Sequence, residues 1–316
     1  MKKNLLILSV LIFISGFSFN AFSQKQKVIL DTDFGDDIDD AYALGLLIAS
    51  PEINILGVVM DYGNTPKRAQ TVCRMLYETG RESIPVVIGR KTNDSYSNQF
   101  NWGEGFDKVQ PVKQTGADFI IEQLKKYPNE VILITIGPIP NIGDILNKEP
   151  EVLKLAKHVY SMFGSFYMGY SSSPIPSAEW NARADIDASR KLLSSGAKIT
   201  FAGLDITTYV SFKYELIETL SNRKSPLTDA LVGLYSLWGF ERDGKGFTLF
   251  DGVAVAMVIW PDLFETRKVF VKVTDEGYTV IDESKEPNCE IGISINTKNF
   301  FDKYMDRIMK QNLMRK

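Results

Sequence analysis

Short apolar runs rich in β-branched residues alternate with longer helical patterns, and this alternation limits the possible folds more than any other feature. The apolar runs cover residues 28–30, 54–60, 84–88 and 131–136, and the helical patterns cover residues 40–50, 66–79 and 116–126. Strands separated by helices of about three turns pair in parallel through right-handed crossovers. The runs lack polar alternation, which is typical of strands covered on both faces. We therefore predict an α/β fold with an open, mostly parallel, Rossmann-like sheet and helices on both faces.

Ligands of such open sheets bind outside the carboxyl ends of the strands. Side chains that carry chemistry are therefore expected directly after each apolar run. Two segments rich in Gly, Asn and charged residues, Asn93 to Gly105 and Arg242 to Thr248, are predicted to be mobile loops. No internal repeat or low-complexity linker divides the chain, so residues 24–316 are expected to form one domain.

Residues 1–23 have the pattern of a secretory signal peptide. A lysine pair precedes an apolar run over residues 5–19, and Ala21 and Ser23 then place small residues before a cleavage site. The alternative is a membrane anchor, because the apolar run is near the lower length limit for spanning a bilayer. The small residues favour cleavage, so we expect a mature protein that is exported to the periplasm and keeps no stable membrane anchor.

Charge and cysteine content exclude two classes of protein. A net charge of −3 and a pI of about 5.5 offer no basic surface, so no nucleic-acid partner is expected. Cys73 and Cys289 do not make a disulfide framework in a chain of 316 residues. An exported protein could pair them, but Cys73 lies in a helical pattern, where a small buried thiol is the simpler interpretation.

Six aspartates occur within ten residues after the first apolar run, in the segment Asp31-Thr32-Asp33-Phe34-Gly35-Asp36-Asp37-Ile38-Asp39-Asp40. Aspartate is favoured at a helix N-cap and in the first turn, but capping accounts for only one or two of them. The others repel one another unless a cation neutralises them or several are protonated. Carboxylate oxygens at irregular spacing suit a hard cation such as Ca²⁺ or Mg²⁺. We therefore predict a metal site in this segment.

Two protein groups carry Asp-x-Asp after a first strand. One contains phosphotransferases that use the pair as nucleophile and acid with Mg²⁺. The other is the inosine-uridine preferring nucleoside hydrolase family, whose signature is Asp-x-Asp, a nearby Gly and Asp-Asp-Ala-x-Ala. The segment from Asp31 to Leu44 resembles the second signature, although its Asp-Asp pair comes two residues later than in the common form.

Further motifs resemble this family in the same order along nearly the whole mature chain. They are Gly63-Asn64, Gly137-Pro138-Ile139-Pro140-Asn141, Ala178-Glu179-Trp180-Asn181 with Asp185, Asp251 in the segment Phe250 to Val255, and the tail over residues 271–301. One such motif would be weak, but five in order favour the nucleoside hydrolases over the phosphotransferases. The resemblance implies the nucleoside hydrolase fold.

The resemblance also implies a reaction, which is hydrolysis of the N-glycosidic bond of a nucleoside or related N-riboside by a calcium-activated water. In the family, the second Asp of the first motif both binds metal and takes the proton of the water, so Asp33 is implied to be catalytic. The implied metal ligands are Asp33, Asp40, Asp251 and the carbonyl of Ile136. The displaced Asp-Asp pair leaves open whether Asp37 joins them.

Four polar residues are implied to hold the sugar hydroxyls, namely Asp39, Asn64, Glu179 and Asn181. Alternatives exist, since Asn64 could be a left-handed turn residue and Glu179 a helix-entry residue. A site that hydrogen-bonds a hydroxyl can reject an analogue lacking it by about 10⁴-fold or more, so ribosides are expected to be preferred over deoxyribosides.

The chain departs from the family on the side of the departing base. Phe250 stands where family members often carry a histidine acid, Trp102 corresponds to a binding histidine of the first lid loop, and Ser173 corresponds to an asparagine. The single histidine, His158, starts a predicted buried strand far from the motifs, where a structural role is expected. The candidates to contact the base are Trp102, Trp180, Tyr235, Trp238 and Arg242, with ordinary packing as the alternative for Tyr235 and Trp238.

A non-catalytic, metal-dependent riboside- or sugar-binding protein of the same fold is the alternative function. Asp33 argues against it, because a binding protein needs the cation but no base. The family also suggests a homodimer or homotetramer.

Overall fold

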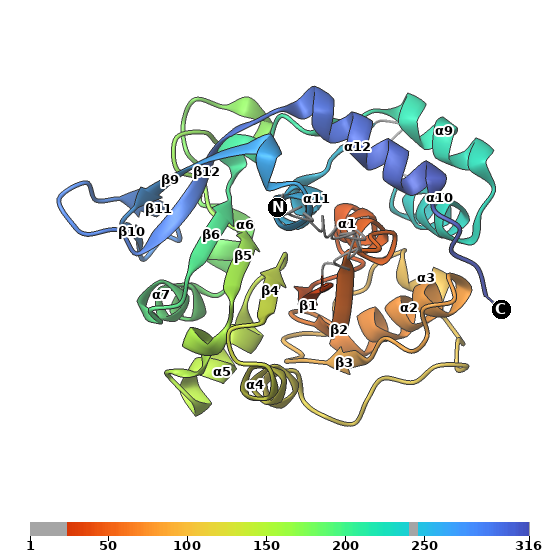
Figure 1. The fold of residues 1–316 in the computed structure, drawn as a ribbon, viewed down its shortest axis with the longest axis horizontal. Coiled ribbons are helices and arrows are strands. Elements are labelled where there is room, and N and C mark those ends of the chain that lie inside the picture. Colours follow the sequence, from red (N-terminus) through yellow and green to blue (C-terminus); the bar gives the residue numbers. More distant parts are fainter. Residues whose placement is uncertain (1–23, 240–245, 316) are drawn as a thin grey trace, which may run out of the picture.

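The computed structural model describes residues 24–239 and 246–315, and its centre is an eight-stranded sheet flanked by helices (Figure 1). The strands are β1 (Gln26–Thr32), β2 (Ile53–Met60), β3 (Val86–Ile88), β4 (Val131–Thr135), β5 (His158–Met162), β6 (Ile199–Ala202), β9 (Phe264–Val269) and β12 (Cys289–Ile295). They lie in the order β3-β2-β1-β4-β5-β6-β12-β9, and every neighbouring pair is parallel except β12 with β9. The prediction of an open, mostly parallel sheet is confirmed.

Helices cover both faces of this sheet. They are α1 (Asp39–Ile48), α2 (Thr65–Glu78), α3 (Phe100–Gly103), α4 (Gly116–Lys126), α5 (Pro140–Lys148), α6 (Trp180–Ala184), α7 (Ile186–Ser194), α8 (Leu204–Thr207), α9 (Tyr214–Arg223), α10 (Pro226–Trp238), α11 (Phe250–Ile259) and α12 (Thr297–Lys310), with the short 3-10 helices η1 (Val152–Leu155), η2 (Tyr170–Ser172) and η3 (Pro261–Leu263). Helices α4, α5 and α7 lie on one face, and α1, α11 and α12 lie on the other (Figure 1). Among the described residues, no helix is long and apolar enough to cross a membrane.

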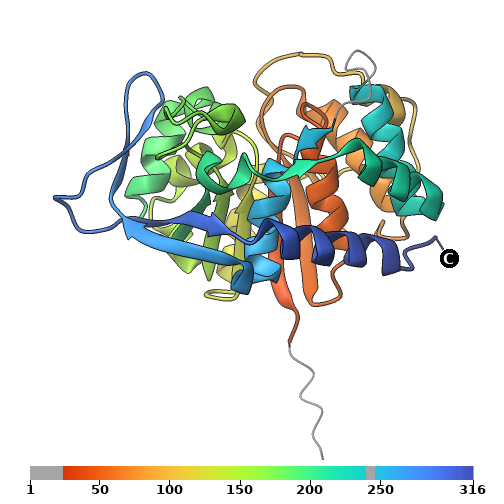
Figure 2. The ribbon, with the colours of Figure 1, turned by 90° about the horizontal axis from the view of Figure 1, so that it is seen from above.

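Two small antiparallel sheets complete the fold. Strand β7 (Ser211–Phe212) pairs with β8 (Phe247–Thr248), and β10 (Val271–Val273) pairs with β11 (Thr279–Ile281). Figure 2 shows the loops around β10 and β11 projecting beyond one edge of the molecule.

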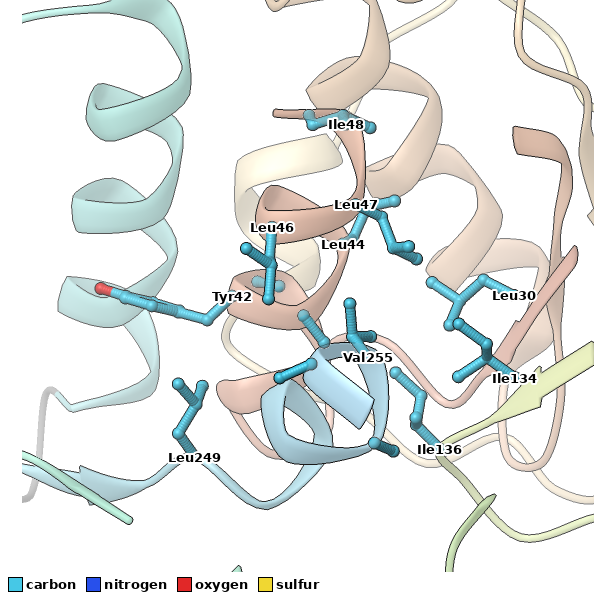
Figure 3. Close-up of a cluster of buried hydrophobic side chains, with 14 of the residues drawn as sticks. Leu30, Tyr42, Leu44, Leu46, Leu47, Ile48, Ile134, Ile136, Leu249 and Val255 are labelled. Carbon is cyan, nitrogen blue, oxygen red and sulfur yellow. The ribbon is translucent and has the colours of Figure 1, made fainter. Parts of the chain in front are cut away.

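Each face of the sheet has its own hydrophobic core. In the larger core, side chains of α1 and α11 meet side chains of β1 and β4 (Figure 3). Helix α11 is buried along most of its length, as expected for a helix that is apolar on all sides. Because α1 and α11 pack against each other, their first turns lie together at the carboxyl end of the sheet.

Most element predictions hold, and the differences have local causes. Strand β1 continues past its apolar run, since Asp31 and Thr32 still pair with Val59 and Met60 of β2. Strand β3 is shorter than predicted. The two predicted loops are wrong in part, because Phe100–Gly103 is helical and Phe247–Thr248 is a strand. Residues 242–245 of the second loop, and the predicted signal peptide, lie outside the described residues.

Both cysteines are buried and free. Cys73 belongs to the core around α1 and Cys289 to the core on the opposite face, so the sheet separates them. The buried thiol expected at Cys73 is confirmed, and His158 is the first residue of β5, as predicted.

Candidate active site

A cavity of about 270 Å³ lies at the carboxyl end of the sheet. The residues that line it come from the β1–α1 turn, the ends of β4 and β5, the segment leading into α6, and the facing ends of α10 and α11. They are Asp33, Asp36, Asp37, Asp39, Asp40, Ile136, Met162, Tyr170, Glu179, Trp180, Asn181, Trp238, Phe250 and Asp251. The cavity therefore lies where the fold predicts ligand binding.

The aspartate-rich segment turns sharply from β1 into α1. Oγ1 of Thr32 donates to Oδ1 of Asp40 and accepts the N–H of Phe34 at 3.1 Å, which ties the two ends of the turn together. Gly35 has a φ of +97°, and a Cβ there would lie 3.0 Å from the ring of Phe100, so a glycine is required. The turn leaves Asp36 and Asp37 exposed at the rim of the cavity and buries Asp33, Asp39 and Asp40.

Asp39, Asp40 and Asp251 form a buried carboxylate group, in which one oxygen of each lies within 4.8 Å of the others. Asp39 and Asp40 begin α1, and Asp251 lies in the first turn of α11, with its N–H donating to Oδ2 of Asp39 at 3.0 Å. Burial, and then repulsion from neighbouring carboxylates, raises the pKa of all three well above the usual range. An oxygen-only donor set with this much uncompensated charge can hold a metal ion of the hard type.

A second set of carboxyls lies beneath this group. Burial raises the pKa of Asp33 to about 7. The carboxyls of Asp33 and Asp61 both lie against Gly137, since a Cβ added there would lie 2.5 Å from Oδ1 of Asp33 and 2.7 Å from Oδ1 of Asp61. Asp31 has a pKa of about 7 for the same reason, although Nδ2 of Asn141 donates to it at 2.7 Å. Asp61 follows β2 and is fully buried, and no N–H or O–H of the described residues donates to its oxygens. Burial and the neighbouring Asp31 and Asp33 raise its pKa.

Arg68 of α2 supplies a buried positive charge next to these carboxyls. Its side chain is 1% exposed, and its Nη1 donates to the carbonyl oxygens of Asp33 and Phe34, the second at 3.0 Å. Nε donates to the carbonyl of Tyr62 at 2.9 Å, and Nη2 lies 3.8 Å from Oδ2 of Asp36. Arg68 thus holds the backbone of the aspartate turn from inside the fold and partly offsets the rise in the pKa of Asp33.

The loops after β4 and β5 present a carbonyl, an amide and a carboxylate to the cavity. Asn181 donates from Nδ2 to the carbonyls of Ile136 and Met162, both at 3.0 Å, which leaves its Oδ1 as the polar atom available to a ligand. Glu179 caps α6 by accepting the N–H groups of Asn181 at 2.9 Å and Ala182 at 3.1 Å. Burial raises the pKa of Glu179, and these backbone donors limit the rise.

Aromatic side chains also line the cavity, namely those of Tyr170, Trp180, Trp238 and Phe250. The rings of Tyr170 and Phe250 meet edge to face at 6.2 Å, and Tyr62 meets Trp180 in the same way at 6.1 Å. Trp238 adds a further ring at the end of α10. The cavity is therefore lined by both acidic and aromatic side chains, which suits a ligand with a sugar and a flat base.

The sequence matches the model of the inosine-uridine preferring nucleoside hydrolases over residues 28–302. The chain belongs to this family. It is 33% identical to the uncharacterized protein C1683.06c of Schizosaccharomyces pombe over 81% of this chain and 89% of that protein. It is 28% identical to the pyrimidine-specific ribonucleoside hydrolase RihA of Citrobacter koseri over 89% of this chain and 97% of that protein.

The fold agrees with solved nucleoside hydrolase structures. The plant nucleoside hydrolase PpNRh1 superposes with a TM-score of 0.80 at 22% identity, covering 90% of this chain and 99% of that chain. As a member of the nucleoside hydrolase family, the protein is an enzyme that hydrolyses N-glycosidic bonds. Membership favours the hydrolase over the non-catalytic binding protein.

Not every residue that the nucleoside hydrolase motifs indicated lies in the cavity. Asn64 precedes α2 and lines a separate cavity beside Lys67 and Phe106. Its φ is −88°, so it is not the left-handed turn residue considered as the alternative. Trp102 packs against the guanidinium of Arg74, with that group 4.6 Å from the ring.

Among the described residues, Tyr235 is a further base-contact candidate that does not line the cavity. Tyr235 is buried in the core against Tyr42, Phe247 and Trp238, so packing accounts for it. Arg242 lies outside the described residues. Trp180 and Trp238 are therefore the two candidates of this set that the structure brings to the site.

Several residues of this nucleoside hydrolase site were missed by sequence reasoning. Tyr170, Met162 and Asp36 line the cavity, and Asp61 and Arg68 lie behind it. Asp61 directly follows an apolar run, so the rule that chemistry follows strands could have indicated it. Arg68 and Tyr170 had no such signal, because their place in the site depends on contacts distant in sequence.

Proposed function

We propose that the protein is a calcium-dependent ribohydrolase that cleaves nucleosides or related N-ribosides with weakly basic leaving groups. The observation that carries this proposal is the lining of the cavity, which combines buried carboxyl groups with aromatic rings and contains no histidine among the described residues.

The donor set fits Ca²⁺, which takes six to eight oxygen ligands in a flexible geometry. Asp33, Asp40, Asp251 and the carbonyl of Ile136 are the proposed protein ligands, and the position of Asp39 within the carboxylate group makes it a further candidate. Asp37 is exposed at the rim of the cavity, outside the buried carboxylate group. When bound, Ca²⁺ would orient a water molecule and lower its pKa.

The residues of the chain supply the remaining chemistry. Asp33 acts as the base that takes the proton of the attacking water, while its backbone is held by Arg68. Glu179 and the Oδ1 atom of Asn181 hold sugar hydroxyls and align the sugar as it gains oxocarbenium character. The Nδ2 group of Asn181 also keeps the carbonyl of Ile136 in place.

The departing base would lie between Trp180, Trp238 and Phe250. Indole and phenyl rings can stack on a base but cannot protonate it, and a positioned general acid is typically worth about 10²–10⁴-fold in rate. We therefore expect ribosides whose leaving group needs no proton, such as nitrophenyl riboside or nicotinamide riboside, to be cleaved much faster than inosine or uridine.

The test is kcat/KM for inosine, uridine, nicotinamide riboside and a nitrophenyl riboside at saturating Ca²⁺ and one pH. We expect release of ribose from all of these ribosides, with the activated ribosides ahead by about 10²-fold or more. Failure to cleave any riboside would contradict the proposed reaction. Equal kcat/KM for inosine and the activated ribosides would contradict only the expectation that the site has no general acid for the leaving base.

Two wider properties belong to the same proposal. The signal-like segment over residues 1–23 supports export to the periplasm, and the N-terminal sequence of protein recovered from that compartment should begin near Gln24. The family resemblance supports a homodimer or homotetramer, which light scattering on the purified protein would establish.

A further inference from the structure

Tyr170 brings a hydroxyl group to the cavity that none of the family motifs indicated. It is the first residue of η2, and its hydroxyl accepts the N–H of Trp180 at 2.9 Å. The same hydroxyl donates to Oε1 of Glu179 at 3.4 Å. Burial and the neighbouring Glu179 raise the pKa of Tyr170, so the phenol stays protonated and remains a donor.

The segment that carries Tyr170 is held firmly by its surroundings. The carboxylate of Asp205 accepts the N–H groups of Phe166 at 2.9 Å, Tyr167 at 2.6 Å and Met168 at 3.2 Å. Ser171 and Ser172 follow with φ values of 54° and 59°, a conformation that is uncommon outside glycine. Strained residues of this kind persist where the surrounding structure fixes them, and they cluster at functional sites.

The two oxygens of Glu179 are used unequally. Oε2 accepts the N–H groups of Gly164 at 2.9 Å and Ala182 at 3.1 Å, so it is committed to the backbone. Oε1 accepts the N–H of Asn181 at 2.9 Å, and its second contact is the long one from Tyr170. At 3.4 Å this contact is near the outer limit for a hydrogen bond between oxygens, which leaves Oε1 open to a better donor.

We propose that Tyr170 is a substrate-contact residue which, together with Glu179, recognises one sugar hydroxyl of the riboside. The substrate hydroxyl donates to Oε1 of Glu179 and accepts from the hydroxyl of Tyr170. The substrate hydroxyl then donates one hydrogen bond and accepts another. A sugar that lacks this hydroxyl leaves both Glu179 and Tyr170 without that partner. The inference rests on the proposed riboside hydrolysis and adds a specificity residue to it.

The test compares Tyr170→Phe with the unchanged protein on a nitrophenyl riboside and on its 2′-, 3′- and 5′-deoxy analogues. Tyr167→Phe is the matched control, since its hydroxyl contacts Arg267 and the residue does not line the cavity. We expect Tyr170→Phe to lower kcat/KM for the full riboside about tenfold, chiefly through KM. We expect no loss for the one analogue that lacks the contacted hydroxyl, and no loss for the control variant on any substrate.

The possible outcomes separate the inference from the function it rests on. An equal loss on the riboside and all three analogues would show a structural role and overturn the inference, as would no loss on any of them. A melting temperature of Tyr170→Phe within about 2 °C of the unchanged protein shows that the fold is intact. If the unchanged protein cleaves none of the four substrates, the proposed function fails and the inference fails with it.

Discussion

Acidic residues at the two ends of the central sheet have different neighbours. At the amino end, Glu52 and Glu130 precede β2 and β4, and each is paired with a cation. Glu52 accepts from Arg307 twice at 2.9 Å, and Glu130 lies 2.5 Å from Nζ of Lys27. At the carboxyl end, Asp33 and Asp61 follow β1 and β2, and both are buried among other carboxyls.

This difference indicates which charges serve the fold and which serve the reaction. Buried carboxylates with raised pKa values oppose folding, because the ionised form has lost its hydration without gaining a matching partner. Residues whose placement destabilises the fold are expected at functional sites. The amino end carries the balanced charges of an ordinary protein surface, whereas the carboxyl end carries charges that need a ligand.

The largest expected effect is that of removing the metal from the carboxyl end. We predict that protein purified without chelator contains about one equivalent of Ca²⁺ by elemental analysis, because the buried carboxylates require a counter-charge. Treatment with EDTA should abolish hydrolysis, and added Ca²⁺ should restore it. Full activity of the metal-free protein would contradict the conclusion that the carboxylates at the carboxyl end of the sheet need a bound metal.

Removing one carboxylate from each end tests the comparison residue by residue. Asp251→Ala should weaken Ca²⁺ binding by at least about hundredfold, because it removes an oxygen from the carboxylate group. The matched change Glu52→Gln at the amino end should leave Ca²⁺ binding and kcat/KM unchanged. Calorimetric titration of both variants checks this, and similar affinities in the two would contradict it.

A smaller effect is expected for the cation beneath the aspartate turn. Arg68→Met should lower the free energy of unfolding by about 3 kcal/mol, because buried carbonyl oxygens lose their donor and nearby carboxyls lose a positive charge. Arg81→Met is the matched control, since this exposed arginine also donates to a backbone carbonyl, that of Ile48 at 3.3 Å. Urea unfolding at saturating Ca²⁺ measures the free energy of unfolding of both variants. Equal small losses would show that Arg68 stabilises the fold no more than an exposed arginine does.

Part of this arrangement could be predicted from the sequence, and part could not. The sheet was predictable because apolar runs and helical patterns are local, and the cavity was predictable because polar side chains follow strands at one edge. The positions of Asn64 and Trp102 were not, since loop packing decides whether a motif residue turns toward the site. The roles of Arg68 and Tyr170 depend on partners that only the folded chain brings together.

The smallest expected effect concerns His158 at the amino end of β5. Burial lowers the pKa of His158, whose Nε2 lies 2.8 Å from Oγ1 of Thr200. The unfolded chain then binds the proton more readily, so this contribution to stability is present above the unfolded pKa of about 6.5 and is lost as the pH falls. His158→Gln should reduce the drop in melting temperature between pH 7.5 and 5.5 at saturating Ca²⁺ and leave kcat unchanged. A clear loss of kcat would contradict the conclusion that catalysis takes place only at the carboxyl end of the sheet.

The most direct test of the proposed reaction is the kcat of Asp33→Ala on a nitrophenyl riboside, measured at saturating Ca²⁺ and saturating substrate. Asp33 is proposed to take the proton of the attacking water, so its loss should lower kcat by about 10³-fold or more even when metal and substrate are bound. Binding of the riboside, measured by calorimetry, shows that the site is filled during the assay. A kcat within tenfold of that of the unchanged protein would contradict the assignment of Asp33 as the base.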